Sequence, residues 1–207
     1  MITVVANLKG GSGKSTVSFN LLAWLVEQGR EVKAFDLDPQ RTLSDVAQVR
    51  KEEEHEPALL VNAVDMPSFD HAEHVEVIID VGAANLDGMR EAIRYADRVI
   101  IPVPPSQPDV WATQRFLKIV ADARNGVEKA LEIITFVNRA DTHHAVRESD
   151  DTEAALQQLP GITVLPQRLY QRTLYRRSMS EGLAVFELWR SSKGADEFEA
   201  LANALYQ

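Results

Sequence analysis

Ten residues near the N-terminus, NLKGGSGKST at positions 7–16, place three glycines and two lysines between an apolar run and an amphipathic segment. The apolar run Ile2–Ala6 predicts a strand, and residues 16–28 carry an apolar stripe typical of a helix. The backbone N–H groups of a glycine-rich turn and the positive end of a helix together attract anions without any side chain. We therefore expect a strand, a phosphate-binding loop and a helix, in that order.

The side chains of this loop predict how it holds a nucleotide. Lys14 is expected to reach the β and γ phosphates, and the Ser15 hydroxyl to ligate magnesium. The usual spacing of such loops puts a first glycine at Leu8, and the chain offers Lys9 beside it instead. A plain tight turn is the alternative, although Gly-Lys-Ser at a helix start is hard to explain by turn chemistry alone. The nucleotide-binding residues expected in the loop are Gly10, Gly11, Ser12, Gly13, Lys14, Ser15 and Thr16.

Short apolar runs alternate with amphipathic segments along the rest of the chain. Runs with little polar alternation are typical of parallel strands covered on both faces. Their alternation with helical segments predicts a doubly wound α/β fold, with a mostly parallel sheet and helices on both faces. The predicted strands are residues 2–6, 31–35, 75–80, 98–103, 131–137 and 161–165. The predicted helices are residues 16–28, 86–95, 110–123, 145–159 and about 196–206, and the charged run 51–56 is expected to be a solvated helix end.

Length and composition narrow the class of protein further. The 207 residues fit one α/β domain with a sizeable core. The absence of cysteine from the sequence excludes disulfide frameworks, Cys-ligated metal sites and thiol catalysis. The net charge of −9 means that any polyanion must bind at a local patch. Because the sequence contains no apolar run of 18 residues and its N-terminus is interpreted as a strand, we expect a soluble cytoplasmic protein.

The stretch KGGSGKST resembles the deviant Walker A loop of the ParA/MinD ATPases, in which Lys9 matches the signature lysine. The resemblance covers residues 2 to about 190 and is strongest to small plasmid-partition ParA proteins. It implies a single P-loop ATPase domain over residues 1–207, with ATP and Mg²⁺ as cofactors. In this family the signature lysine crosses a dimer interface to the nucleotide of the other subunit. The resemblance therefore implies catalytic roles for Lys14 on its own nucleotide and for Lys9 on the partner's.

Two later motifs fit the same resemblance. Asp38 in FDLDPQ matches the family's water-positioning aspartate, which implies a third catalytic residue, and Asp36 lies close to the implied magnesium shell. Taken alone, Asp-x-Asp-Pro is also an ordinary strand-end turn. The run VIIDVG resembles a Walker B strand, which implies that Asp80 holds Mg²⁺ through water and that Gly82 lies close to the γ-phosphate. The implied metal-site residues are Ser15, Asp36 and Asp80.

Candidates for contacts with the base come from the second half of the chain. The segment IPVPPSQPD resembles the family's proline-rich segment, and FVNR lies where its base-contacting loop begins. This implies nucleotide contacts from Asn138 and Arg139, for which an ordinary strand cap is an equal alternative. Arg168 is a further candidate, either for the base or for a dimer interface.

Several relatives of this fold are excluded by missing features. The nitrogenase iron protein needs cluster cysteines, and the tail-anchor targeting ATPases carry a Cys-x-x-Cys pair, whereas this chain has no cysteine. MinD anchors through a basic amphipathic C-terminal helix, but here the tail ADEFEALANALYQ is acidic, so we expect no membrane partner. Related bacterial tyrosine kinases end in a tyrosine cluster, and this end holds only Tyr206.

Residues 168–193 carry a local excess of positive charge. Six basic and two acidic residues give this segment a charge of +4 and leave −13 for the remainder. Arg172 and Arg176 are four apart, which predicts one face of a helix, and Arg168 is expected to continue that side. Phosphate contacts alone suffice for DNA binding without sequence preference, although a solvated basic helix that balances an acidic body is the alternative. The predicted DNA-binding residues are Arg172, Arg176, Arg177, Arg190 and Lys193.

Together these features predict a ParA-type ATPase. We expect it to dimerise on ATP, to bind nucleoid DNA without sequence preference and to segregate a plasmid, with a ParB-like or other cargo adaptor that stimulates hydrolysis. The same mechanism could position a protein organelle such as the carboxysome. A different class, a metabolic synthetase or amidoligase of the same superfamily, would use the loop to make an acyl phosphate and would need a substrate pocket rather than a basic surface. A scaffold that binds nucleotide without turnover is the third alternative.

Overall fold

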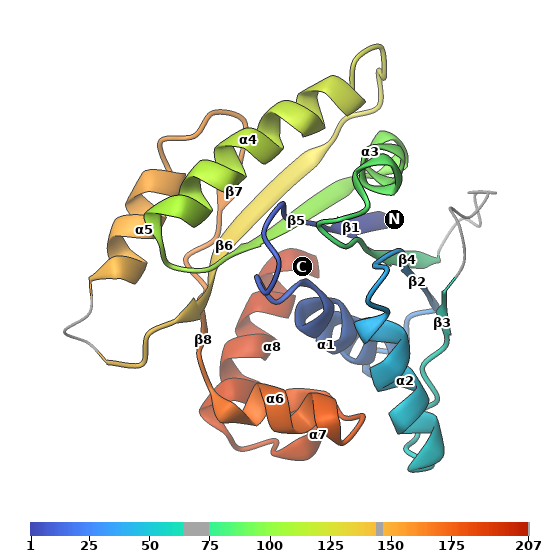
Figure 1. Cartoon of the computed structure of the whole chain (residues 1–207). Coiled ribbons are helices and arrows are strands. Elements are labelled where there is room, and N and C mark those ends of the chain that lie inside the picture. The colour runs from blue at the N-terminus through green and yellow to red at the C-terminus, as the bar shows by residue number, and fades with distance from the viewer. Residues whose placement is uncertain (64–74, 144–146, 207) are drawn as a thin grey trace.

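The computed structural model describes residues 1–63, 75–143 and 147–206. Its strands lie in one sheet and its helices pack against both faces (Figure 1). The strands are β1 (Ile2–Val5), β2 (Val32–Asp36), β3 (Val61–Asn62), β4 (Glu76–Asp80), β5 (Arg98–Val103), β6 (Glu132–Ala140), β7 (Thr163–Val164) and β8 (Leu169–Tyr170). The helices are α1 (Lys14–Glu27), α2 (Thr42–Glu52), α3 (Leu86–Tyr95), α4 (Gln107–Ala123), α5 (Glu148–Leu156), α6 (Thr173–Ser180), α7 (Val185–Leu188) and α8 (Lys193–Tyr206).

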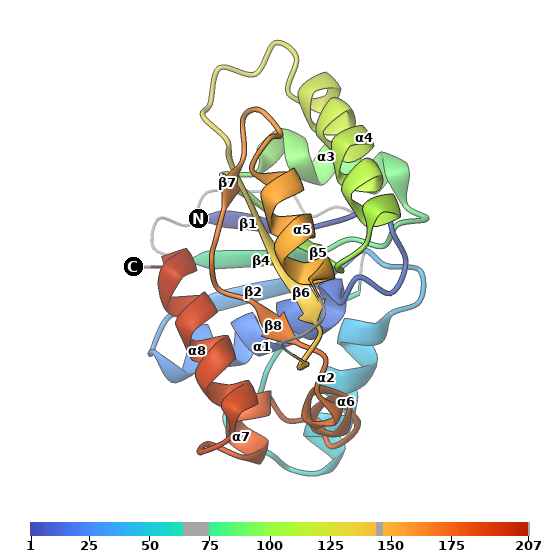
Figure 2. The ribbon, with the colours of Figure 1, turned by 90° about the vertical axis from the view of Figure 1, so that its left-hand side faces the viewer.

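The sheet has the strand order β3-β2-β4-β1-β5-β6-β7, and every strand pair is parallel. β8 pairs with the end of β6 after a register shift between Asn138 and Ala140, and Figure 2 shows the chain passing from β8 into α6. Because all strands run the same way, their carboxyl ends lie at one edge of the sheet. The predicted doubly wound, mostly parallel α/β fold is confirmed.

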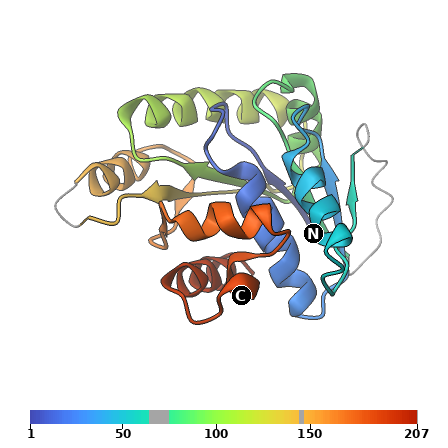
Figure 3. The same ribbon diagram turned by 60° about the horizontal axis from the view of Figure 1, so that its bottom comes forward.

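Successive residues of the central strands point into two separate hydrophobic clusters. Val5 and Ile78 pack with α1, α2 and the C-terminal helices on one face, whereas Val4 and Ile79 pack with α3, α4 and α5 on the other. Figure 3 shows these two helical layers on opposite sides of the sheet. Because the central strands are buried on both faces, their sequences are continuous apolar runs rather than alternating apolar and polar residues.

Some elements differ from the sequence prediction at their ends. α4 starts at Gln107 rather than Val110, because the Ser106 side chain accepts a hydrogen bond from the N–H of Asp109 and caps the helix there. α8 starts at Lys193, three residues before the predicted start. The predicted start of the helix over 145–159 lies partly outside the described residues, and α5 covers Glu148–Leu156. None of the described helices has the length and apolar character required to cross a bilayer.

Candidate active site

The glycine-rich loop lies between β1 and α1, at the edge of the sheet where the parallel strands end. It borders a cavity of about 780 Å³. The predicted catalytic and nucleotide-binding residues that line this cavity are Gly10, Gly11, Gly13, Lys14, Ser15, Thr16, Asp38, Asn138 and Arg139, and Arg172 and Arg176, predicted to bind DNA, line it as well. The cavity thus collects residues from the ends of β1, β2, β4 and β6, as the common direction of the strands requires.

Two glycines give the loop its shape, and β6 holds it in place. Gly11 and Gly13 have φ values of +73° and +91°, a left-handed region that residues other than glycine rarely adopt. A Cβ at Gly13 would lie 2.3 Å from Asn138 Nδ2, which donates to the carbonyl of Ser12 at 2.6 Å. Arg139 donates to the carbonyl of Gly11 at 2.6 Å. The carbonyls of Gly11 and Ser12 are therefore held by side chains from the end of β6.

Lys14 is a buried cation that forms no ion pair with any residue that the structure describes. Its side chain is enclosed, and Nζ donates to the carbonyl of Lys9 at 3.2 Å. Burial lowers the pKa of Lys14, and the nearby carboxylates of Asp80 and Asp38 oppose this shift. An anion in the loop would supply the missing counter-charge.

Asp80 is fully buried at the end of β4, in the position expected for a metal-site carboxylate. Ser15 Oγ donates to its Oδ2 at 2.6 Å, and Ser18 Oγ donates to its Oδ1 at 3.1 Å. Burial raises the pKa of Asp80 to about 7, and hydrogen bonds from the two hydroxyls only partly offset the cost of desolvation. A divalent cation would stabilise the charged carboxylate, adding to the effect of the positive charge of Lys14.

Asp36 and Asp38 leave the neighbouring strand β2, and the structure gives them different surroundings. Asp36 pairs in register with Asp80, and its oxygens accept from the N–H of Asp38 and from the N–H and Oγ of Ser44. It therefore holds the start of α2. Asp38 lines the cavity with one oxygen bound to the N–H of Gln40. A Cβ at Gly82 would lie 2.4 Å from Asp38 Oδ1, so only glycine fits beside this carboxylate.

These residues fit a magnesium nucleotide. The Ser12 hydroxyl is buried and has no hydrogen-bond partner among the residues that the structure describes, which leaves it available to donate to an anion. Within the described ranges, no group of three or more His, Cys, Asp or Glu residues could hold a metal alone. Mg²⁺ needs no such group, because it keeps several waters and takes phosphate oxygens with one or two protein ligands. The Ser15 hydroxyl and the Asp80 carboxylate would supply that share.

Lys9 is placed differently from Lys14. Its N–H donates to Asn7 Oδ1 at 3.0 Å and its carbonyl accepts from Lys14, so the backbone is fixed. The side chain is partly exposed and does not line the cavity. Its ammonium group makes no ion pair with any residue that the structure describes.

Arg168 lies outside the cavity. Its guanidinium donates to Asp150 at 2.6 Å and to Glu153 at 2.6 and 2.8 Å. Both carboxylates belong to α5, so Arg168 ties the start of β8 to that helix. The structure therefore does not bring Arg168 to the nucleotide cavity, and the alternative expectation of a dimer contact stays a prediction.

Much of the predicted basic surface is neutralised by carboxylates. Arg172 pairs with Glu197, Arg177 with Glu181 at 2.8 Å, and Arg190 with Glu27 and Glu199. Arg176 and Lys193 are exposed and form no ion pair with a described residue. The expected helix face shared by Arg172 and Arg176 is wrong in part. Arg172 is the extended residue before α6, with φ −112° and ψ 139°.

Four site residues were missed by the motif analysis. Asn7 is buried and donates to the carbonyl of Pro102 at 2.9 Å, which joins the loop to β5. Ser18 and Ser44 bind Asp80 and Asp36 as described above, and Gln171 accepts from Arg139 Nε at 2.7 Å. Ser18 lies three residues after Ser15, a spacing that puts both hydroxyls on one helix face and could have identified it.

A glycine-rich loop that joins the first strand of a parallel sheet to a helix, with a buried lysine and a carboxylate at the next strand end, defines a P-loop nucleotide-binding protein. The model of the CobQ/CobB/MinD/ParA nucleotide binding domain matches residues 3–185, and the chain belongs to this family. It is an ATPase of the ParA/MinD type, as the loop predicted.

Similar proteins place the chain among positioning and partition ATPases. It is 31% identical over 206 residues to the maintenance of carboxysome distribution protein A of Halothiobacillus neapolitanus, covering 96% of this chain and 93% of that protein. It is 28% identical over 184 residues to ParA of Rhizobium radiobacter, covering 84% and 80%. The solved structure of apo McdA from Cyanothece has a TM-score of 0.75 at 21% identity, covering 98% of both chains, which shows the shared fold.

The cofactors are ATP and Mg²⁺. Solved structures with this fold hold ATP, or ADP with magnesium, and the donors described above match such a ligand. When bound, Mg²⁺ neutralises phosphate charge that builds up as the terminal phosphoryl group leaves. In this chain the loop N–H groups and Lys14 would bind the phosphates, and Ser15 and Asp80 would hold the cation. Asp38 lines the cavity beside Gly82, and its role in orienting the attacking water stays a prediction.

Proposed function

We propose that this ATPase closes into a dimer on ATP, binds DNA without sequence preference, and positions or segregates a cargo while an adaptor protein stimulates hydrolysis. In the cell this activity belongs in the cytoplasm, on the nucleoid. The observation that carries the proposal is the ammonium group of Lys9. Lys9 belongs to the phosphate loop, which already has Lys14 as a cation for the phosphates. The Lys9 side chain does not line the nucleotide cavity of its own subunit and has no described ion-pair partner.

A second subunit gives Lys9 a role that its own subunit does not. A cation supplied from a partner stabilises the charge that develops on a transferred phosphoryl group, as an arginine finger does. Lys14 serves the nucleotide of its own subunit, because its side chain is buried beneath that loop. Hydrolysis and dimerisation then depend on each other through Lys9.

The DNA surface centres on the basic residues that lack carboxylate partners. Arg176 on α6 and Lys193 at the start of α8 are exposed, and each is free to contact a phosphate. Arg177 is 67% exposed and shares only a surface pair with Glu181, which costs little to break. Arg172 and Arg190 must exchange carboxylates for phosphates to take part. Two subunits side by side double the number of phosphate contacts, which makes dimer closure a switch for DNA binding.

The cargo separates two candidate functions that share this mechanism. Plasmid partition was predicted from the loop, and the similarity to ParA of Rhizobium radiobacter supports it. Positioning of a protein organelle is the second candidate, favoured by the similarity to the carboxysome distribution protein over 96% of this chain. A synthetase of the same superfamily would instead require an acyl acceptor in the cavity. If DNA stimulated ATP hydrolysis without any small-molecule acceptor, that result would exclude the synthetase class.

The proposal is tested by DNA binding measured with ATP, with ADP and without nucleotide, over a salt series. We expect binding only with ATP, the same affinity for unrelated sequences, and a steep loss as salt rises. Arg176→Glu with Lys193→Glu should abolish binding. Arg115→Glu with Lys118→Glu on α4 makes the same charge change on the opposite face of the sheet and should preserve it. DNA binding that is equally strong without ATP would refute the switch.

A further inference from the structure

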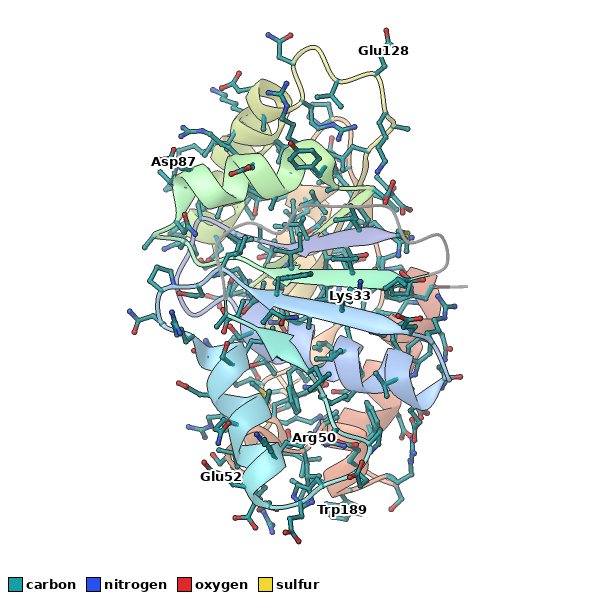
Figure 4. All side chains as sticks on the ribbon, turned by 90° about the vertical axis from the view of Figure 1, so that its right-hand side faces the viewer. Lys33, Arg50, Glu52, Asp87, Glu128 and Trp189 are labelled. Carbon is teal, nitrogen blue, oxygen red and sulfur yellow. The ribbon has the colours of Figure 1, made fainter. Side chains whose placement is uncertain are left out.

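Arg50 is a buried charge that the nucleotide site does not explain. Four charged side chains are buried in the described parts of the chain, namely Lys14, Asp36, Asp80 and Arg50. The first three belong to the site. Arg50, only 1% exposed, lies near the end of α2 on the side that faces the C-terminal segment (Figure 4).

Each of the three guanidinium nitrogens of Arg50 donates a hydrogen bond. Nη1 and Nη2 each donate to one carboxylate oxygen of Glu187 at 2.8 Å, which makes a bidentate pair. Nε donates to the carbonyl of Pro57 at 2.9 Å, and Nη1 also donates to the carbonyl of Gly182 at 3.1 Å. Such a planar fork orients both partners, which a flexible lysine would not do.

The backbone around this pair fits as closely as the side chains. Gly182 has a φ of +65°, and a Cβ there would lie 2.4 Å from the backbone N of Arg50. A ring nitrogen of His55 lies 3.1 Å from the carbonyl of Glu181. Glu187 also accepts from the N–H of Ala184 at 2.7 Å. The turn between α6 and α7 is therefore seated on the C-terminal end of α2.

The opposite end of α2 belongs to the hydrolysis site. The helix starts directly after residues 37–41, which we call the Asp38 loop. Ser44 of the helix donates to Asp36 through both its N–H and its hydroxyl. α6 leads into the docked turn, and the N–H of Leu183 bonds to the carbonyl of Ser178 within it. Residues from α2 and α6 both line the cavity. One rigid helix thus connects the Asp38 loop to the segment that carries Arg176.

We propose that the Arg50–Glu187 pair makes α2 and the α6–α7 segment move as one unit, so that Arg50 is a positioning residue that couples the Asp38 loop to the helix of Arg176. Stability alone does not require this pair, because an apolar pair of similar volume serves a protein interior equally well. The coupling to DNA rests on the proposed function, whereas the coupling between the two helices does not.

Amide hydrogen exchange tests the coupling without DNA. In the unmodified protein, a non-hydrolysable ATP analogue with Mg²⁺ should slow exchange in residues 42–52 and also in residues 173–188. Arg50→Met with Glu187→Met removes the fork without leaving a buried charge unpaired. In this variant residues 42–52 should still respond, and residues 173–188 should not. Arg177→Met with Glu181→Met, an exposed pair in the same segment, should respond like the unmodified protein.

Hydrolysis provides a second readout. The Arg50→Met with Glu187→Met variant should lower kcat by about 3- to 30-fold, which corresponds to a typical coupling energy, with KM for ATP unchanged. If this variant does not fold, Arg50→Lys and Glu187→Gln supply the same comparison. Exchange of residues 173–188 that never responds to nucleotide, or that responds equally in the variants, would overturn the inference. If the unmodified protein showed no ATP-dependent DNA binding, that result would instead count against the proposed function.

Discussion

The carboxylate of Asp38 rests against the backbone of Gly82, close enough that a methyl group at position 82 would lie 2.4 Å from Oδ1. The two residues follow neighbouring strands, β2 and β4, and meet because both strands end at the same edge. Gly82 has no left-handed φ to explain it. Its lack of a side chain is needed for space, and the space is occupied by the predicted water-positioning group.

Gly82→Ala should therefore displace Asp38 and slow hydrolysis. A displacement of about 1 Å in a catalytic group costs on the order of 100-fold in rate. We expect a fall in kcat of about 10- to 100-fold with little change in ATP affinity, measured by steady-state hydrolysis and by equilibrium binding. In an Asp38→Ala background the same change should have no further effect on kcat. An additional loss there would show that Gly82 acts on another group.

Asp80 should make the stability of the nucleotide-free protein depend on pH. Burial raises its pKa from an ordinary value of about 3.9 to about 7, so between these values the native state holds a proton that the unfolded chain has lost. The free energy of unfolding should therefore fall as pH rises from about 4 to about 7, by up to about 4 kcal/mol. Urea unfolding at pH 5 and pH 8, without Mg²⁺, measures the difference.

Asp80→Asn should reduce this pH dependence, because the amide does not titrate. The variant should be more stable than the unmodified protein at pH 8, with a much smaller difference at pH 5. Asp45→Asn, at an exposed position of α2, is the control and should leave the pH profile unchanged. An equal pH dependence in the Asp80 variant would assign the effect to other groups.

Arg139 should act as a brace for the phosphate loop. It has a φ of +60° and donates at once to the carbonyl of Gly11 and to the side chain of Gln171. Arg139→Ala should weaken ATP binding by about 10-fold, as expected for loss of one charge-assisted hydrogen bond. Arg139→Lys should not restore affinity, since one ammonium lacks the planar fork that reaches both partners. Full affinity in the alanine variant, by calorimetry, would contradict this role.

The two lysines of the loop should separate binding from dimerisation. Lys14→Ala should abolish ATP binding, because it removes the buried charge that faces the phosphates. Lys9→Ala should spare ATP binding by the monomer and reduce ATP-dependent dimerisation and hydrolysis. Sizing chromatography in an Asp38→Ala background, where turnover is blocked, compares the two directly. A Lys9 variant that forms the ATP dimer as readily as its parent would remove the reason to place Lys9 across an interface.

Local motifs were enough to predict the phosphate loop and the strand ends, because each depends on neighbours in the chain. α2 was missed, except for its charged end. Its buried face consists of Leu43, Val46, Ala47 and Arg50, so an arginine takes the position where the helical period calls for an apolar residue. Nothing near Arg50 in the sequence reveals that Glu187, 137 residues away, is its partner.

The charge of +4 counted over residues 168–193 does not show how many of these cations are paired in the fold. Arg168 is paired with carboxylates of α5, and Arg172 with Glu197 of α8. These carboxylates belong to the acidic remainder of the chain, so a sum over the segment alone does not include them. Only the fold brings the opposite charges together, and within residues 168–193 it leaves Arg176 and Lys193 exposed without a described ion-pair partner.

The ties between the phosphate loop and β6 also bear on protein engineering. A ten-residue peptide copied from positions 7–16 would carry every residue of the motif. It would lack the two groups that bind the loop carbonyls, which are the amide of Asn138 and the guanidinium of Arg139. Transplanting this loop into another scaffold therefore also requires the end of β6, from more than half the chain away. Gly13 must be kept as well, because its lack of a side chain leaves room for Asn138.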